Sequence, residues 1–170
     1  MLDAPEFIAP APNNDELKRQ EIALAENNKP TAFKLRAQLL EQGRTDTMLA
    51  ATDGLTLRLK IYASGGENTL HAHTSEDHSF IILQGSARFY GPDDEAIELG
   101  RYEGIMLPRG NYYWFHATGD EPLVMIRVGN PNYSKQPKPT RIDVHGEEMR
   151  GDSKENKKVE VIFRDGEFFG

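Results

Sequence analysis

The chain has 170 residues and a net charge of −7, with 38% hydrophobic and 28% charged residues, which fits a single domain with one core. It has no Lys/Arg-dense block that would bind nucleic acid, and no apolar run approaches the ~18 residues that a membrane span needs. The absence of cysteine excludes disulfides, thiolate chemistry and Cys-bound zinc. The opening MLDAPEFIAP lacks a basic region followed by an apolar stretch, so we expect no signal peptide and a cytoplasmic location.

Residues 1–45 are predicted to form a helical arm. Capping and acidic residues open the segment NNDELKRQEIALAENN, which ends in two asparagines. A second helix is predicted in TAFKLRAQLLEQG, where Phe33, Ala37 and Leu40 recur at helical spacing and Gly43 provides a stop. We expect these helices to cover a sheet or to contact a partner subunit.

Residues 46–129 have the pattern of a β-sheet domain. The stretch LTLRLKI alternates apolar with polar residues, which is the two-residue period of a half-buried strand. Gly, Pro or Asp clusters separate the further short runs HSFIILQ, SARFY, AIEL, GIML, YYWFHAT and PLVMIRVG. Short strands without helices between them indicate an antiparallel sandwich or barrel. The predicted wall residues are Phe80, Ile82, Phe89 and Met106, and the arginines predicted to point outward are Arg58, Arg88 and Arg127.

Residues 130–170 are rich in proline and charge and are predicted to form an extended arm that wraps the surface. The run VEVIF predicts one late strand, which would pair with the barrel or with a neighbouring subunit. His145 lies in the Pro-rich part of this arm and is expected to be exposed.

The stretch GGENTLHAHTSEDHSFIILQG holds three of the five histidines. His71 and His73 are two residues apart in a predicted strand, so their imidazoles share one face. A chain that turns across TSED brings His78 back beside them. A lone histidine is usually structural, but three converging neutral imidazoles suit a divalent transition metal. The cluster therefore predicts a metal site.

The same stretch resembles the first motif of the cupin superfamily. In that motif a glycine is followed after five residues by HxH, then by a glutamate, and six residues later by another glycine. Gly65, His71, His73 and Gly85 match this spacing, and His78 stands where the family has glutamate. The resemblance assigns His78 to a ligand position.

The second cupin motif is matched in part, by the segment PRG at residues 108–110. Tyr113 stands where the family has its last histidine ligand, Ala117 where it has asparagine, and Tyr102 at the leading glycine. His116 lies three residues past the ligand position and would face opposite to Tyr113 in a regular strand, unless a β-bulge turned it inward. The fourth metal position is therefore left to His116, to Tyr113 as a phenol or phenolate, or to water.

The resemblance implies an all-β fold over residues 46–129. This fold is the antiparallel double-stranded β-helix, or jelly-roll barrel, with the helical arm before it and the extended arm after it. The resemblance also implies a small-molecule substrate and, together with the two arms, a homodimer. We expect neither nucleic acid nor a membrane as a partner.

A histidine in place of glutamate at His78 leaves the metal charge uncompensated in the barrel, which favours an anionic ligand. Some cupin dioxygenases use all-histidine sites. The resemblance therefore implies a dioxygenase-like oxidoreductase that acts on a small enolisable, phenolic or carboxylate substrate. We expect a divalent transition metal, iron first, with zinc, nickel, manganese or copper as alternatives.

Two other interpretations stay open. A lyase or isomerase on the same barrel would use the metal as a Lewis acid and Tyr113 or Glu76 for proton transfer. Glu76 would otherwise orient a histidine ring or lie in an exposed acidic turn. Because the second motif is imperfect, the barrel could also be a non-catalytic ligand-binding module or a subunit of a hetero-oligomer.

Overall fold

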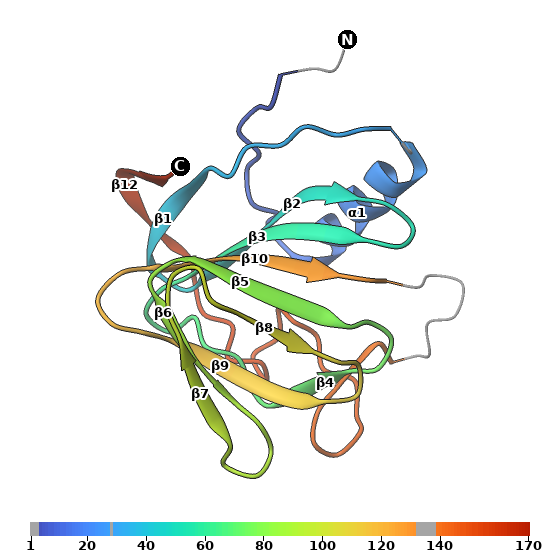
Figure 1. Ribbon diagram of the computed structural model, residues 1–170, viewed down its shortest axis with the longest axis vertical. Helices are drawn as coiled ribbons and strands as arrows, with labels where there is room; N and C mark the ends of the chain where they lie inside the picture. The colour runs from blue at the N-terminus through green and yellow to red at the C-terminus, as the bar shows by residue number, and fades with distance from the viewer. Residues whose placement is uncertain (1–3, 28, 132–138) are drawn as a thin grey trace.

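The computed structural model describes residues 4–27, 29–131 and 139–170, which form one helix and twelve strands. The helix α1 (Asn14–Asn27) precedes the strands in the chain (Figure 1). Residues 1–3 of the predicted helical arm, and residues 132–138 of the predicted extended arm, lie outside the described part. The helix is too short and too polar to cross a membrane, and no other helix is present in the residues described.

Two five-stranded sheets face each other and form the barrel (Figure 1). The first sheet has the order β2 (Arg44–Ala51), β3 (Thr56–Tyr62), β10 (Leu123–Gly129), β5 (His78–Gln84) and β8 (Gly104–Leu107). The second has the order β11 (Arg141–Ile142), β4 (His71–His73), β9 (Tyr112–Thr118), β6 (Ser86–Tyr90) and β7 (Ala96–Leu99). Neighbouring strands are antiparallel throughout. The structure confirms the all-β jelly-roll fold.

The chain passes from the first sheet to the second at Gly85, between β5 and β6. Its φ is 73°, in the region that glycine adopts without strain. A Cβ here would lie 3.1 Å from the carbonyl oxygen of Pro122. The turn therefore needs the glycine that closes the first motif.

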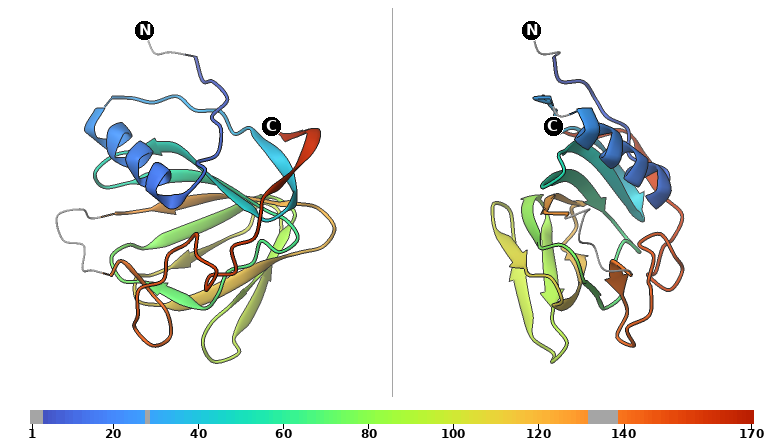
Figure 2. Two further views of the ribbon diagram at one scale, coloured as in Figure 1. Left: turned by 180° about the vertical axis from the view of Figure 1, so that it is seen from behind. Right: turned by 90° about the vertical axis from the view of Figure 1, so that its right-hand side faces the viewer.

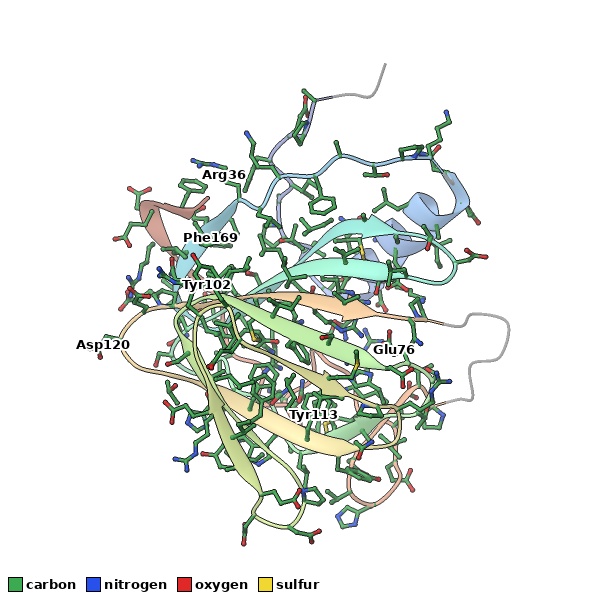
Figure 3. The ribbon with its side chains drawn as sticks, viewed as in Figure 1. Arg36, Glu76, Tyr102, Tyr113, Asp120 and Phe169 are labelled. Carbon is green, nitrogen blue, oxygen red and sulfur yellow. The ribbon has the colours of Figure 1, made fainter. Side chains whose placement is uncertain are left out.

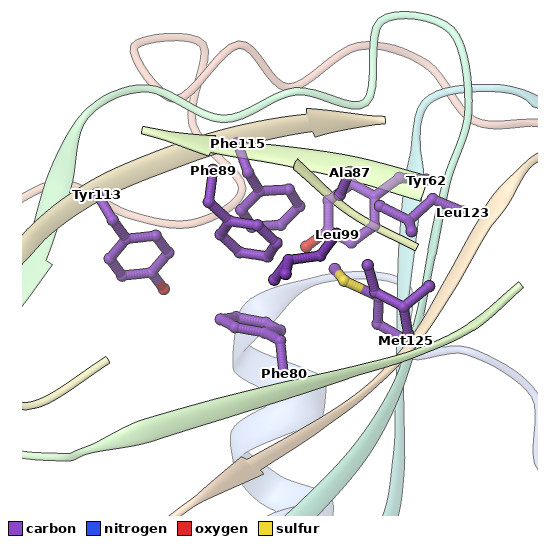
Figure 4. Packing of buried hydrophobic residues seen from close by; sticks show 10 residues of the cluster. Tyr62, Phe80, Ala87, Phe89, Leu99, Tyr113, Phe115, Leu123 and Met125 are labelled. Carbon is purple, nitrogen blue, oxygen red and sulfur yellow. The ribbon is translucent and has the colours of Figure 1, made fainter. Parts of the chain in front are cut away.

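The core lies between the two sheets and is rich in aromatic rings (Figure 4). Phe80 and Ile82 of β5 contribute to it from one sheet, and Phe89 and Phe115 from the other. These positions confirm three of the predicted wall residues. The prediction for Met106 is wrong, because this side chain is 64% exposed. In the register of β8 with β5 it is paired with Ser79, so both residues lie on the outer face.

The segment predicted as a second helix is a strand, so that prediction is wrong. β1 (Ala37–Gln42) pairs with β12 (Ile162–Phe169), and two register shifts interrupt the ladder. These shifts let both Leu39 and Leu40 be buried, which produced the helix-like spacing. The late strand predicted from VEVIF is present as β12, but it begins later and continues through the RDG segment. The described part of the extended arm crosses the back of the barrel on its way to β12 (Figure 2).

Strand β3 points its polar side chains into the barrel. Leu59 and Ile61 pack outward in a cluster with residues of β1, whereas Arg58 and Lys60 face inward. The prediction that Arg58 points outward is therefore wrong. Helix α1 covers the edge of this sheet beside β2 (Figure 2), and its Glu21 accepts a hydrogen bond from Arg58 at 2.6 Å. Charged groups, rather than apolar ones, thus fill this end of the barrel.

Candidate metal centre

A cavity of about 940 Å³ opens between the two sheets. Its walls come from the inner faces of β3, β5, β9 and β10, from the segment that contains α1, and from the C-terminal arm. Figure 3 labels two of the residues that line the cavity, Glu76 in the loop before β5 and Tyr113 on β9. The residues outside the barrel strands therefore shape the cavity as much as the barrel does.

The structure brings the three clustered histidines together in this cavity. His71 and His73 lie on the short strand β4, and His78 opens β5 after the TSED turn. The ring centroids of His71 and His73 are 5.1 Å apart, and those of His73 and His78 are 4.1 Å apart. Asp77 fixes the turn between them, because its carboxylate accepts hydrogen bonds from the Arg109 amide at 2.8 Å and from the Asn130 side chain at 2.9 Å.

Glu76 points into the cavity and joins two of the histidines. One potential donor atom each of His73, Glu76 and His78 lies within 4.8 Å of the others. The Glu76 Oε1 atom is 3.0 Å from His78 Nε2 and 3.7 Å from His73 Nδ1. Only 15% of the Glu76 side chain is exposed, so it does not form an exposed acidic turn. His71 lies next to this donor group.

The protonation states suit metal binding. Burial lowers the pKa of His73 well below its usual value, and burial together with the Arg127 charge lowers the pKa of His78 to about 4. Burial would raise the pKa of Glu76, but the charge of Arg127 and the hydrogen bond to His78 outweigh it, so the pKa is lowered. Neutral imidazoles and an ionised carboxylate are the forms that bind metals.

His71 has the orientation of a supported ligand. Burial lowers its pKa, so the ring is neutral. Its Nδ1 atom lies 2.6 Å from the carbonyl oxygen of Thr69, to which a neutral ring donates. This hydrogen bond fixes the tautomer and leaves Nε2 as the basic nitrogen, as in many metal-binding histidines.

Tyr113 lies beside the donor group as a neutral phenol. It pairs with His71 across β4 and β9, and its hydroxyl oxygen is 3.3 Å from His78 Nδ1. Burial raises the pKa of this phenol above its usual value, which disfavours the phenolate. The geometry favours the role of a hydrogen-bonding group that faces the cavity.

The structure does not bring His116 to this group. The ladder between β6 and β9 runs without a register shift from Ser86 to Tyr90, so no bulge turns His116 inward. Its ring lies on the opposite face, with its centroid 5.6 Å from those of Tyr90 and Trp114.

Arg127 points inward, so the prediction that it faces outward is wrong. Only 4% of it is exposed. Its Nη2 group donates to Glu76 Oε1 at 2.7 Å and contacts His78 Nε2. The sequence does contain the signal for this orientation, because Arg127 alternates with Leu123 and Met125, which lie in the core.

The fold and its inward-facing histidine cluster agree with the comparisons with known proteins. Residues 58–129 match the family model of the cupin domain. This matched part of the chain, which holds most of the barrel and the three clustered histidines, is similar to the cupin domain. None of the curated proteins matches the sequence.

Solved structures of other proteins share the fold at low sequence identity. An uncharacterized protein with a double-stranded β-helix domain from Klebsiella pneumoniae is 15% identical, with a TM-score of 0.55, over 64% of this chain and 90% of that one. BH2720 from Bacillus halodurans is 18% identical, with a TM-score of 0.54, over 64% and 86%. The cupin domain of Cnp3 from Schizosaccharomyces pombe is 19% identical, with a TM-score of 0.52, over 59% and 68%. At these identities the likeness shows the fold alone.

The donor group in this barrel fits a divalent transition metal. Two neutral imidazoles and one carboxylate converge, and the second nitrogen of His78 is already engaged by Tyr113. The guanidinium of Arg127 donates to the same atoms of Glu76 and His78 that would bind the metal. Arg127 and a metal ion are therefore alternatives at these two atoms.

Replacing Arg127 by methionine is expected to raise the affinity for Zn(II) by about tenfold or more. The variant removes a cation that competes with the metal, together with its hydrogen bonds. A hydrogen bond that involves a charged group contributes about 1.5–3 kcal/mol. A competition titration against a chromogenic chelator measures the change. Arg88→Met makes the same substitution in the strand β6, away from the cavity, and should leave the affinity unchanged. An equal or lower affinity in R127M would show that Arg127 supports the donors instead of competing with the metal.

Proposed function

We propose that this cupin is a metal-dependent oxidoreductase that uses Fe(II) and O2 to oxidise a small anionic substrate. The observation that carries the proposal is the convergence of His73, Glu76 and His78 in a cavity between the sheets. Two histidines and one carboxylate are the ligand set typical of non-haem Fe(II) oxygenases. The sequence predicts an all-histidine site without a negative charge. The proposed ligand set differs from that prediction, because Glu76 contributes a carboxylate.

The residues of the chain would have separate roles. His73, Glu76 and His78 would hold the metal, and His71 would complete or align the set through the nitrogen that its bond to Thr69 leaves free. The bound metal would supply Lewis acidity and access to one-electron chemistry with O2. Tyr113 would donate a hydrogen bond to an oxygen of the substrate.

A lyase or isomerase is the second candidate, and the neutral phenol of Tyr113 favours it. A buried hydroxyl 3.3 Å from an imidazole can transfer a proton in a reaction that needs no oxidant. The same donor group would then act as a Lewis acid only.

Metal content and the requirement for oxygen test the proposal together. The chain, purified without an affinity tag or chelator, should bind about one equivalent of Fe(II), since the described residues form one donor group. The Fe(II)-loaded protein is then incubated with a panel of enolisable and phenolic acids in an oxygen-electrode cell. Oxygen uptake that matches substrate loss supports the oxygenase. Turnover under strict anaerobiosis supports the lyase or isomerase, and failure to bind Fe(II), Zn(II), Ni(II) or Mn(II) supports a non-catalytic binding module.

We also propose a homodimer in the cytoplasm. The support for the dimer is a group of exposed apolar side chains on and beside the strands β5 and β8, namely Ile81, Tyr102 and Met106, which are 40%, 82% and 64% exposed. Light scattering coupled to size-exclusion chromatography measures the mass directly. A mass of one chain at micromolar concentration would contradict the dimer.

A further inference from the structure

The cavity has an excess of positive charge that the rest of the molecule does not have. Eight basic and six acidic side chains line it, although the whole chain carries a net charge of −7. A cavity with this balance attracts anions. The excess lies with the basic side chains that have no carboxylate partner among the described residues.

Most of the inward-facing cations are already compensated. Arg58 and Lys60 pair with Glu21 and Asp46, and Arg127 pairs with Glu76. Lys158 and Arg44 have no carboxylate partner among the residues that the structure describes. Lys158 donates to the carbonyl oxygen of Arg44 at 3.0 Å, and the guanidinium of Arg44 donates to four backbone carbonyl oxygens, those of Gly66, Glu67, Gly151 and Asn156. It therefore has little capacity left for a ligand.

Arg141 differs from Arg44 because only two of its donors are used, and from Lys158 because its strand is paired with the strand of the metal donors. Its Nη1 donates to the carbonyl oxygen of Met149 at 3.3 Å, and its Nη2 donates to Asn156 Oδ1 at 2.8 Å. Both acceptors are neutral, and Arg141 forms no ion pair with any residue that the structure describes. A guanidinium has five N–H donors, so about three of them are left for another acceptor.

The register of the sheet places Arg141 beside the metal donors. Arg141 on β11 is the direct partner of His73 on β4, and His71 is the partner of Tyr113 on β9. Side chains of directly paired residues lie on the same face of a sheet, so Arg141 faces the cavity together with these three. It is half-buried and lines the cavity wall.

We propose that Arg141 binds an oxyanion group of the substrate, a carboxylate or a phosphate. The planar guanidinium can donate two parallel hydrogen bonds to either group. An anion held there lies next to His73, so another part of the same molecule reaches the donor group. That the bound anion is part of a substrate rests on the proposed function. It assigns the choice of substrate to the C-terminal arm, because Arg141 lies outside the matched residues 58–129.

Calorimetric titration of the full-length, metal-free chain tests this site without reference to turnover. Succinate and inorganic phosphate are the two probes, at constant ionic strength and up to about 10 mM, which saturates a ligand of millimolar affinity. We expect saturable binding of at least one probe, and the stronger one identifies the oxyanion. Arg141→Gln should weaken this binding about tenfold or more, the usual loss for a charge-assisted bidentate contact.

Two further variants separate ligand binding from a structural role. Arg141→Lys keeps the charge and should retain part of the affinity, whereas a variant that merely unfolds the arm would lose it all. Arg101→Gln removes a half-exposed arginine whose side chain faces Glu121, and should bind as the wild type does. No saturable binding of either probe, equal binding in R141Q, or equal loss in R101Q would overturn the proposal. Because no metal is present, none of these results depends on the metal site.

Discussion

A variant in which His73 and His78 are both replaced by alanine is expected to retain less than about a tenth of an equivalent of Fe(II), compared with about one for the wild type. The two substitutions remove two of the three convergent donors, and Glu76 with the adjacent His71 is too small a set to hold a transition metal against its hydration. Elemental analysis of protein loaded with Fe(II) under argon and then desalted measures the content.

His116→Ala is the matched control for this experiment. It removes the same side chain from the outer face of β9, where the ring packs against Tyr90 and Trp114. It should keep the full metal content. Loss of metal in H116A, or full retention in the double variant, would place the site elsewhere.

The second large effect concerns the ion pairs beneath α1, which join Glu21, Asp46, Arg58 and Lys60. Asp46→Ala is expected to lower the free energy of unfolding by about 3 kcal/mol at neutral pH, because it leaves buried cations without their partner. Asp46 pairs with Lys60 and faces Arg58 at 3.6 Å, and these two side chains are 14% and 16% exposed. Urea denaturation followed by circular dichroism measures the loss. Asp15→Asn is the control. Asp15 is 75% exposed, so its replacement should lower the free energy of unfolding by less than about 0.5 kcal/mol.

The difference between wild type and D46A should be largest near neutral pH. Burial raises the pKa of Asp46, but the charges of Lys60 and Arg58 outweigh it and lower the folded pKa. The stabilisation by Asp46 is therefore fully present at pH values above the pKa that Asp46 has in the unfolded chain. It is lost as the pH falls through the lower pKa of the folded state. Burial lowers the pKa of Lys60 to about 8, so the ion pair also disappears as the pH rises through that value. A difference that is independent of pH would contradict this account.

The approach of the clustered histidines could be predicted from the sequence because short-range rules govern it. His71 and His73 share a face through the two-residue period of a strand, and the turn that returns His78 spans only four residues. The barrel fold followed from the alternation and from the spacing of the first motif. These features depend on neighbours in the chain.

Features that depend on distant pairing were missed. The local spacing in β1 predicts a helix, because the partner that makes it a strand, β12, begins at Ile162, far along the chain. The prediction for the two faces of β3 is wrong at Arg58, since alternation alone does not say which face meets the interior. Glu76 was not assigned to the donor group, because its approach to His78 depends on how Asp77 anchors the turn. No local signal pointed to Arg141, whose position depends on the pairing of β11 with β4.

The pairing of β1 with β12 has a consequence for the way the molecule assembles. About 120 residues separate the two strands, and such non-local contacts form slowly because a long loop must close first. During synthesis, the barrel strands emerge from the ribosome before the arm that carries Arg141 and β12. The cavity therefore acquires the wall that this arm supplies only after all the barrel strands have been made, and until β12 is made, β1 is without its partner strand.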